Sequence, residues 1–176
     1  MATASEVTRL GEEGKQAFEA GQYEPAAEKF RAAANGFASL SDEVNAAEMQ
    51  NNLSVALLKL GRNQAALEAL PGTEQVFARA GDARRQGMAA GNQAAALEAL
   101  QRWDEALAAY ERSAEMFGQA GDGDLRSMVL KSAAAIKLRR GQVSESAFKM
   151  IGSLDAKDKP SLFERLLRSV LRLIQR

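Results

Sequence analysis

A 40-residue period runs through most of this sequence and restricts its fold more than any other feature. Residues spaced by this period fall into columns, and the members of a column have similar side chains. Three of them are the turn column Gly21, Gly61, Gln101 and Gly141, the small column Ala26, Ala66, Ala106 and Ser146, and the large column Phe30, Leu70, Tyr110 and Met150. A fixed period of about 20 to 50 residues indicates a repeat architecture. The sequence therefore predicts a repeat domain over residues 5–154, with units at about 5–41, 42–81, 82–121 and 122–154.

Each unit is expected to contribute two helices joined by a short turn, because good helix formers dominate and the chain has only three prolines. The expected helices lie near 5–20, 24–40, 42–60, 64–80, 82–100, 104–120, 123–140 and 144–154, with a last one near 160–175. Short turns make sequential helices pack antiparallel, so the predicted fold class is all-α. Pro71-Gly72 predicts a break in the helix over 64–80. Asp42, Asp104 and Ser144 are expected N-caps.

Two further columns hold only small side chains, which allow helix backbones to approach closely. They are Gly14, Ser54, Ala94 and Ala134, and Ala33, Thr73, Ser113 and Ser153. Large residues such as Phe37, Phe77 and Phe117 are expected to fill the remaining space of the core. We therefore interpret Trp103 as a core residue of its own repeat, with a stacking platform for a ligand as the alternative.

The first unit contains the pattern Gly21-x-Tyr23-x-x-Ala26-x-x-x-Phe30-x-x-Ala33, with Leu10 and Gly14 upstream, and Trp103-x-x-Ala106-x-x-x-Tyr110 repeats part of it. This pattern resembles the tetratricopeptide repeat over about residues 5–154. The period departs from the family's 34 residues, which implies longer helices. The resemblance implies a right-handed α-solenoid of about four antiparallel helix hairpins, followed by a C-terminal amphipathic helix. It also implies that the first helices of the hairpins line a concave groove that binds a peptide.

Transferring the family's inner face onto this chain gives a set of expected groove residues. They are Lys15, Asn51, Asn52, Val55, Lys59, Met88, Asn92, Ala95, Met128, Lys131, Ser132 and Arg139. Asn52 and Asn92 occupy equivalent positions and resemble the asparagine ladder of O-linked N-acetylglucosamine transferase and kinesin light chains. An asparagine amide can pair with the N–H and the C=O of a peptide at once. The alternative is that both are surface amides on solvated helices. Gly11, Met88 and Asn92 do not match a carboxylate clamp, so we do not expect binding of a chaperone tail.

The C-terminal stretch PSLFERLLRSVLRLIQR is both apolar and basic. Its predicted association surface consists of Phe163, Leu166, Leu167, Val170, Leu171 and Ile174. Three interpretations remain open, namely a helix that caps the repeats, a helix that binds a protein partner or a second copy, and a basic helix on a membrane surface. Charge is also uneven along the chain, because residues 1–60, 61–120 and 121–176 carry net charges of −4, −2 and +6. Nucleic-acid binding is not expected, since no aromatic platform accompanies the arginines.

Composition argues against most kinds of catalysis. The chain has no cysteine and no histidine, which excludes thiolate and histidine metal sites, cysteine nucleophiles and Ser-His-Asp triads. No phosphate-binding loop or calcium loop is present in the sequence. We therefore expect no catalytic, cofactor-binding or metal-binding residues, and no enzymatic activity. The sequence has no apolar run that would serve as a leader or as a membrane span, so a soluble, cytoplasmic location is expected.

Together these patterns predict a non-catalytic scaffold or adaptor that binds a peptide or protein segment in its groove. The alternatives are a subunit that self-assembles through the apolar C-terminal helix, as a homo-oligomer, and a peripheral membrane adaptor anchored by that helix.

Overall fold

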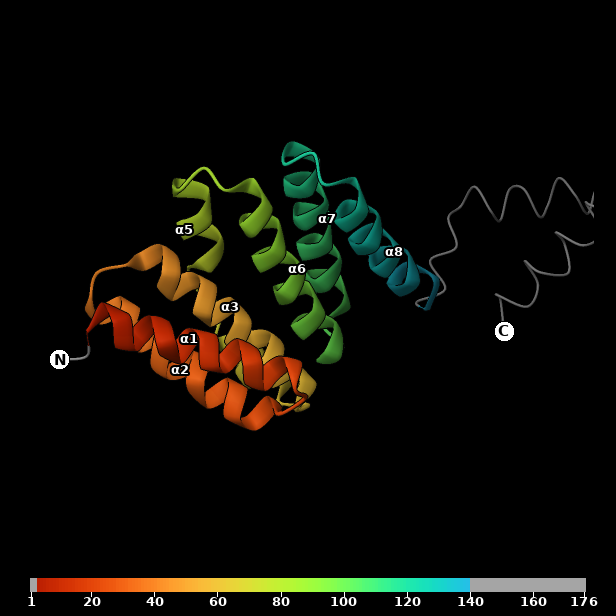
Figure 1. The fold of residues 1–176 in the computed structure, drawn as a ribbon. Helices are drawn as coiled ribbons and strands as arrows, with labels where there is room; N and C mark the ends of the chain where they lie inside the picture. Colours follow the sequence, from red (N-terminus) through yellow and green to blue (C-terminus); the bar gives the residue numbers. More distant parts are fainter. Residues whose placement is uncertain (1–2, 140–176) are drawn as a thin grey trace, which may run out of the picture. The chain divides into compact units, whose positions relative to one another are not determined.

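The computed structural model describes residues 3–139, and these residues form eight α-helices and no strand. The helices are α1 (Ala4–Glu19), α2 (Tyr23–Ser39), α3 (Glu43–Lys59), α4 (Asn63–Glu68), α5 (Thr73–Arg79), α6 (Ala83–Ala99), α7 (Trp103–Gln119) and α8 (Gly123–Arg139). Helices that follow one another pack together, as α1, α2 and α3 do, and as α6 and α7 do (Figure 1). The expectation of an all-helical protein with sequential packing is confirmed for this part of the chain.

The chain divides into two compact units, residues 1–130 and residues 131–176. The first unit contains α1 to α7 and the beginning of α8, and the described part of the second unit is the remainder of α8. In residues 3–139 no helix is long and apolar enough to cross a bilayer.

Left-handed turns end the helices at intervals of 20 residues. The turn residues are Gly21, Ser41, Gly61, Gly81, Gln101 and Gly121, with φ between 59° and 74°. After each of them, the next residue donates its N–H to a carbonyl five positions earlier, as Gln22 does to Ala17 (2.8 Å) and Arg102 does to Leu97 (2.9 Å). This bond satisfies a carbonyl that the helix end leaves without a partner. Glycine reaches such dihedrals without a Cβ clash, so Ser41 and Gln101 are strained exceptions.

Aspartates begin the first helices of three successive hairpins. The side chains of Asp42, Asp82 and Asp122 accept hydrogen bonds from the backbone N–H groups of Asn45, Arg85 and Leu125, at 3.1, 2.8 and 3.1 Å. The prediction for Asp42 is confirmed. The prediction for Asp104 is wrong, because α7 starts at Trp103 and Asp104 lies inside its first turn. The hydrogen bond from Arg85, and the charge of this arginine, lower the pKa of the Asp82 carboxyl.

The predicted break at Pro71-Gly72 is confirmed. The second helix of the second hairpin is divided into α4, which ends at Glu68, and α5, which begins at Thr73. Gly72 has a φ of 86° and precedes α5. The chain therefore changes direction at a residue that needs no Cβ, next to a proline that cannot donate a helical hydrogen bond.

The two helices of a hairpin approach closely where a small residue faces a large one. A Cβ added to Gly14 in α1 would lie 2.8 Å from the ring of Phe30 in α2, and one added to Gly87 in α6 would lie 3.0 Å from the ring of Phe117 in α7. Ser54 and Ala94, which share the column of Gly14, are fully buried. Close packing between small and large side chains is therefore the basis of the first and third hairpins.

Ion pairs join residues that lie about one repeat apart. They are Arg62–Glu24 (2.8 Å), Arg79–Glu43 (2.9 Å), Arg85–Glu48 (3.2 Å), Arg84–Asp122 (3.0 Å) and Arg112–Glu74 (3.5 Å). Each is partly exposed, so each adds little free energy on its own, about 0.2–1 kcal/mol. Their common spacing aligns each hairpin with the next.

We predict that Gln101→Gly stabilises the protein by about 0.5–1 kcal/mol. The substitution removes the Cβ that strains the left-handed backbone conformation at this position. Ala108→Gly, at an exposed position within α7, is the matched control and should destabilise by about 1 kcal/mol. Urea unfolding measures both free energies. Equal losses in the two variants would show that the turn at Gln101 is not strained.

We predict that Asp82→Ala lowers the free energy of unfolding at pH 7 by about 1 kcal/mol, as loss of an N-cap does. The pKa of Asp82 is lower in the folded chain, so its contribution is present above the pKa of the unfolded state and disappears as pH falls through the folded pKa. The difference between the parent and the variant should therefore shrink below about pH 4. Urea unfolding at pH 7 and pH 3 tests this, with Glu115→Ala, an exposed charge in α7, as the control.

Candidate functional site

A pocket of about 260 Å³ opens between α1, α2 and α3. Its lining residues are Lys15, Phe18, Glu19, Phe30, Glu48, Asn52 and Val55. Three of the predicted groove residues, Lys15, Asn52 and Val55, are thus brought together around one cavity. We call it the inner pocket.

Helical spacing explains how these side chains converge. Glu48, Asn52 and Val55 are four and three residues apart, so they lie on one face of α3. Phe30 reaches the pocket from α2 and is only 2% exposed. Phe18 in α1 is half-buried and also packs edge-on against Tyr23, with ring centroids 5.3 Å apart. The apolar part of the inner pocket is therefore held in place by core contacts.

The charged part of the inner pocket is largely self-compensated. The Nζ of Lys15 lies 3.1 Å from Oε1 of Glu12 and 3.6 Å from Oε1 of Glu48. The hydrogen bond to Glu12, with help from the charges of Glu12 and Glu48, raises the pKa of Lys15, so this side chain stays protonated at neutral pH. Glu48 also pairs with Arg85 of α6 at 3.2 Å. A ligand in the pocket would therefore meet few uncompensated charges at the α1–α3 contact.

Asn52 and Glu19 are the polar groups of the inner pocket that remain available among the residues that the structure describes. The side chain of Asn52 is half-buried and lines the cavity. Among the residues that the structure describes, no group forms a hydrogen bond with its amide. A primary amide offers two donors and an acceptor, so Asn52 can bind both polar groups of a peptide unit.

Asn51, the neighbouring residue, has a different role from the one predicted. Only 4% of it is exposed, and its Oδ1 accepts a hydrogen bond from Nδ2 of Asn92 at 2.8 Å. This bond connects α3 to α6. The column comparison gave Asn52 and Asn92 equivalent positions in their repeats and predicted no contact, and in the structure the hydrogen bond of Asn92 is to Asn51. No sequence signal identified this contact, because it joins residues 41 positions apart, which are not in the same column of the 40-residue period.

The remaining predicted groove residues do not line the inner pocket. Met88 and Ala95 of α6 are half-buried, Lys59 of α3 is exposed, and Met128 of α8 is 56% exposed. Lys131, Ser132 and Arg139 belong to the second unit. The predicted association residues Phe163, Leu166, Leu167, Val170, Leu171 and Ile174 lie outside the described residues.

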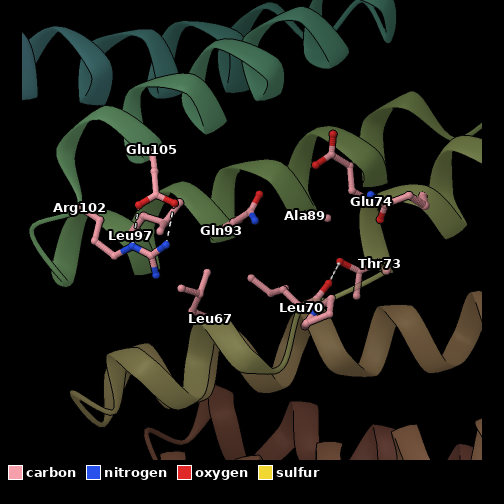
Figure 2. Close-up of a pocket in the computed structure, with 12 residues that line it drawn as sticks. Leu67, Leu70, Thr73, Glu74, Ala89, Gln93, Leu97, Arg102 and Glu105 are labelled. Carbon is pink, nitrogen blue, oxygen red and sulfur yellow. Dashed lines mark hydrogen bonds and ion pairs between the residues drawn. The ribbon is translucent and has the colours of Figure 1, made fainter.

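A second pocket, of about 320 Å³, lies at the break between α4 and α5 (Figure 2). Leu67, Leu70 and Leu97 provide apolar walls. At its rim, Arg102 donates two hydrogen bonds to Glu105, at 2.8 and 2.6 Å. The Thr73 hydroxyl donates to the carbonyl of Leu70 at 2.8 Å. The sequence predicted the break but not the cavity, and these polar groups are already paired with one another.

No metal-binding cluster is found in the described part of the chain, where no three histidine, cysteine, aspartate or glutamate side chains come together suitably. The inner pocket is the candidate site that gathers three of the predicted groove residues, and its lining combines an apolar floor with the amide of Asn52 and the charged groups of Lys15, Glu19 and Glu48.

We predict that Asn51→Ala costs about 1–3 kcal/mol of stability, because it removes a buried hydrogen bond and leaves the Asn92 amide short of a partner. Asn52→Ala, one position along α3, should change stability by less than about 0.5 kcal/mol. Urea unfolding of the two variants measures the contrast. If both substitutions change the free energy of unfolding equally, Asn51 does not have a structural role that Asn52 lacks.

Comparison with known proteins adds no relative to this picture. No protein-family model matches the chain, and no curated protein shows significant similarity to it.

Proposed function

We propose that this chain is a non-catalytic binding scaffold, similar to tetratricopeptide repeat proteins, that holds a peptide segment of a partner protein in the inner pocket. The observation that carries this proposal is the free amide of Asn52 beside an apolar cavity. Such a combination suits a peptide, which presents an apolar side chain and a polar backbone together.

The size of the inner pocket supports a peptide rather than a cofactor. Its volume of about 260 Å³ is below the range of about 300–1,000 Å³ that is usual for sites of small molecules and cofactors. A space of this size suits one or two side chains. Phe18, Phe30 and Val55 would contact the apolar anchor of the peptide, and Asn52 would bind the adjacent peptide group.

The charge arrangement favours an internal segment over a free C-terminus. A terminal carboxylate needs an uncompensated cation, but Lys15 already has Glu12 and Glu48 within 3.1 and 3.6 Å. Binding a carboxylate there would require breaking these ion pairs. An internal peptide unit carries no net charge and makes no such demand.

The repeat geometry supports an extended binding surface. Hairpins recur every 40 residues, neighbouring helices pack in order, and ion pairs connect successive hairpins at separations of 37 and 38 residues. Units that each contact their neighbours stack into a right-handed α-solenoid in this proposal. The inner faces of α1, α3 and α6 would then form one groove, with the inner pocket at its first step.

We predict that the full chain selects peptides from a phage-displayed random library, and that Asn52→Ala weakens their binding about 2–10-fold. One neutral hydrogen bond is worth about 0.5–1.5 kcal/mol, which corresponds to this factor. Val55→Glu should weaken binding more than about ten-fold, because it places a carboxylate against Phe18 and Phe30. Fluorescence anisotropy with the selected peptides measures the affinities.

Asn35→Ala, at an exposed position of α2, is the matched control and should bind like the parent. Thermal unfolding confirms that each variant is folded. The proposal is wrong if no peptide is enriched, or if the enriched peptides bind both inner-pocket variants with unchanged affinity.

A further inference from the structure

Glu19 is the charged residue of the inner pocket that has no counterion in the described part of the chain. The Nζ of Lys15 lies 3.1 Å from Oε1 of Glu12 and 3.6 Å from Oε1 of Glu48. Glu48 also lies 3.2 Å from Arg85. Glu19 lines the same cavity and is exposed, but no described cation comes within ion-pair distance of its carboxylate. The lining of the inner pocket therefore carries one unmatched negative charge.

The position of Glu19 in its helix adds to this negative charge. Glu19 is the last residue of α1, and the last turn of α1 contains no basic residue. The C-terminal end of a helix carries a partial charge of roughly −0.5, so a carboxylate there is unfavourable and a cation is favourable. A cation beside Glu19 is thus attracted both by the carboxylate and by the helix end.

The surroundings of Glu19 do not cancel its charge. Lys59 occupies the position of α3 that corresponds to Glu19 in the 40-residue period. It is exposed, does not line the inner pocket and forms no ion pair with Glu19. Residues 1–60 together carry a net charge of −4, and a net negative field attracts basic segments of a partner.

The unmatched charge lies next to the apolar part of the inner pocket. Glu19 directly follows Phe18 in α1, and both residues line the cavity. An extended peptide rises only about 3.3 Å per residue, so a basic residue within about three positions of an anchor at Phe18 is close to Glu19.

We propose that the inner pocket selects peptide segments that carry a lysine or an arginine near the apolar anchor, with Glu19 as the residue that determines this specificity. This inference rests on the proposed function, because it names the class of peptide that the same pocket binds. The carboxylate of Glu19 would accept hydrogen bonds from the ammonium or guanidinium group of the peptide.

Selection from a phage-displayed random library, with the full chain as bait, tests this class of peptide. Peptides enriched on the parent should carry lysine or arginine near the anchor about 1.5–5 times as often as the unselected library, the factor expected of a partly exposed ion pair. Selection on Glu19→Lys should instead enrich aspartate and glutamate at these positions, because the sign of the charge is reversed.

A double-mutant cycle measures the contact itself. Glu19→Gln is combined with replacement of the basic residue of a selected peptide by glutamine, and fluorescence anisotropy gives the four affinities. We expect a coupling of about 1.5–5-fold at low salt, which disappears at about 1 M salt, where charges are screened beyond about 3 Å. Glu28→Gln removes an exposed carboxylate of α2 outside the pocket lining, so it is the matched control and should show no coupling.

The variants of Glu19 are expected to remain folded. A carboxylate is disfavoured at the end of α1, so Glu19→Gln and Glu19→Lys should unfold at the temperature of the parent or above it. Thermal unfolding measures this. Glu19→Gln should also bind the glutamine-substituted peptide as tightly as the parent does, which separates a lost ion pair from a damaged pocket.

Two outcomes would overturn the proposal and leave peptide binding in the inner pocket intact. One is enrichment of peptides without a basic residue near the anchor, whose binding Val55→Glu still weakens. The other is the same coupling for Glu19→Gln and for Glu28→Gln. If no peptide is enriched at all, both this proposal and the proposed function are wrong.

Discussion

The contact between a small residue in the first helix of a hairpin and a large one in the second is the constraint on which the structure depends. Gly14 under Phe30 and Gly87 under Phe117 leave no room even for a methyl group without movement of the ring. Dispersion and burial of apolar surface at such contacts stabilise each hairpin. The two contacts lie in different columns of the 40-residue period, so the first and third hairpins place a small residue under a large one at different levels of the helix pair.

The turns and the ion pairs then arrange the hairpins. A left-handed residue follows α1, α2, α3, α5, α6 and α7 at intervals of 20 positions, and aspartate caps begin α3, α6 and α8. Bonds between hairpins, such as Arg85 to Glu48 and Asn92 to Asn51, hold α6 against α3. The Arg85–Glu48 ion pair is partly exposed, so it sets alignment more than stability. Asn51 is buried, so its hydrogen bond also contributes to stability. Lys15, Asn52 and Val55 of α1 and α3 line a pocket beside these contacts.

The inner pocket shows how neighbouring residues on one helix come to differ in role. Successive helical residues point about 100° apart, so Asn51 turns toward α6 while Asn52 lines the cavity. The buried amide of Asn51 needs a hydrogen-bond partner within the protein, because an unsatisfied buried polar group costs free energy. The half-buried amide of Asn52 can bond to water, and to a ligand when one is bound. Our proposal of peptide binding depends on this difference. The broken helix α4–α5 opens another cavity nearby, but its rim is already paired.

By itself the sequence determined the helices, the period and the break at Pro71-Gly72, since these depend on local propensity and on side-chain size in register. The resemblance to tetratricopeptide repeats grouped Lys15, Asn52 and Val55, and helical spacing, which is a local property, puts Asn52 and Val55 on one face of α3. The tertiary structure decided which faces meet. It buried Asn51, joined it to Asn92 across the repeat, compensated Lys15 with Glu12 and Glu48, and left Asn52 free. Such contacts depend on the rotation and offset of packed helices, and residues far apart in the sequence determine these together.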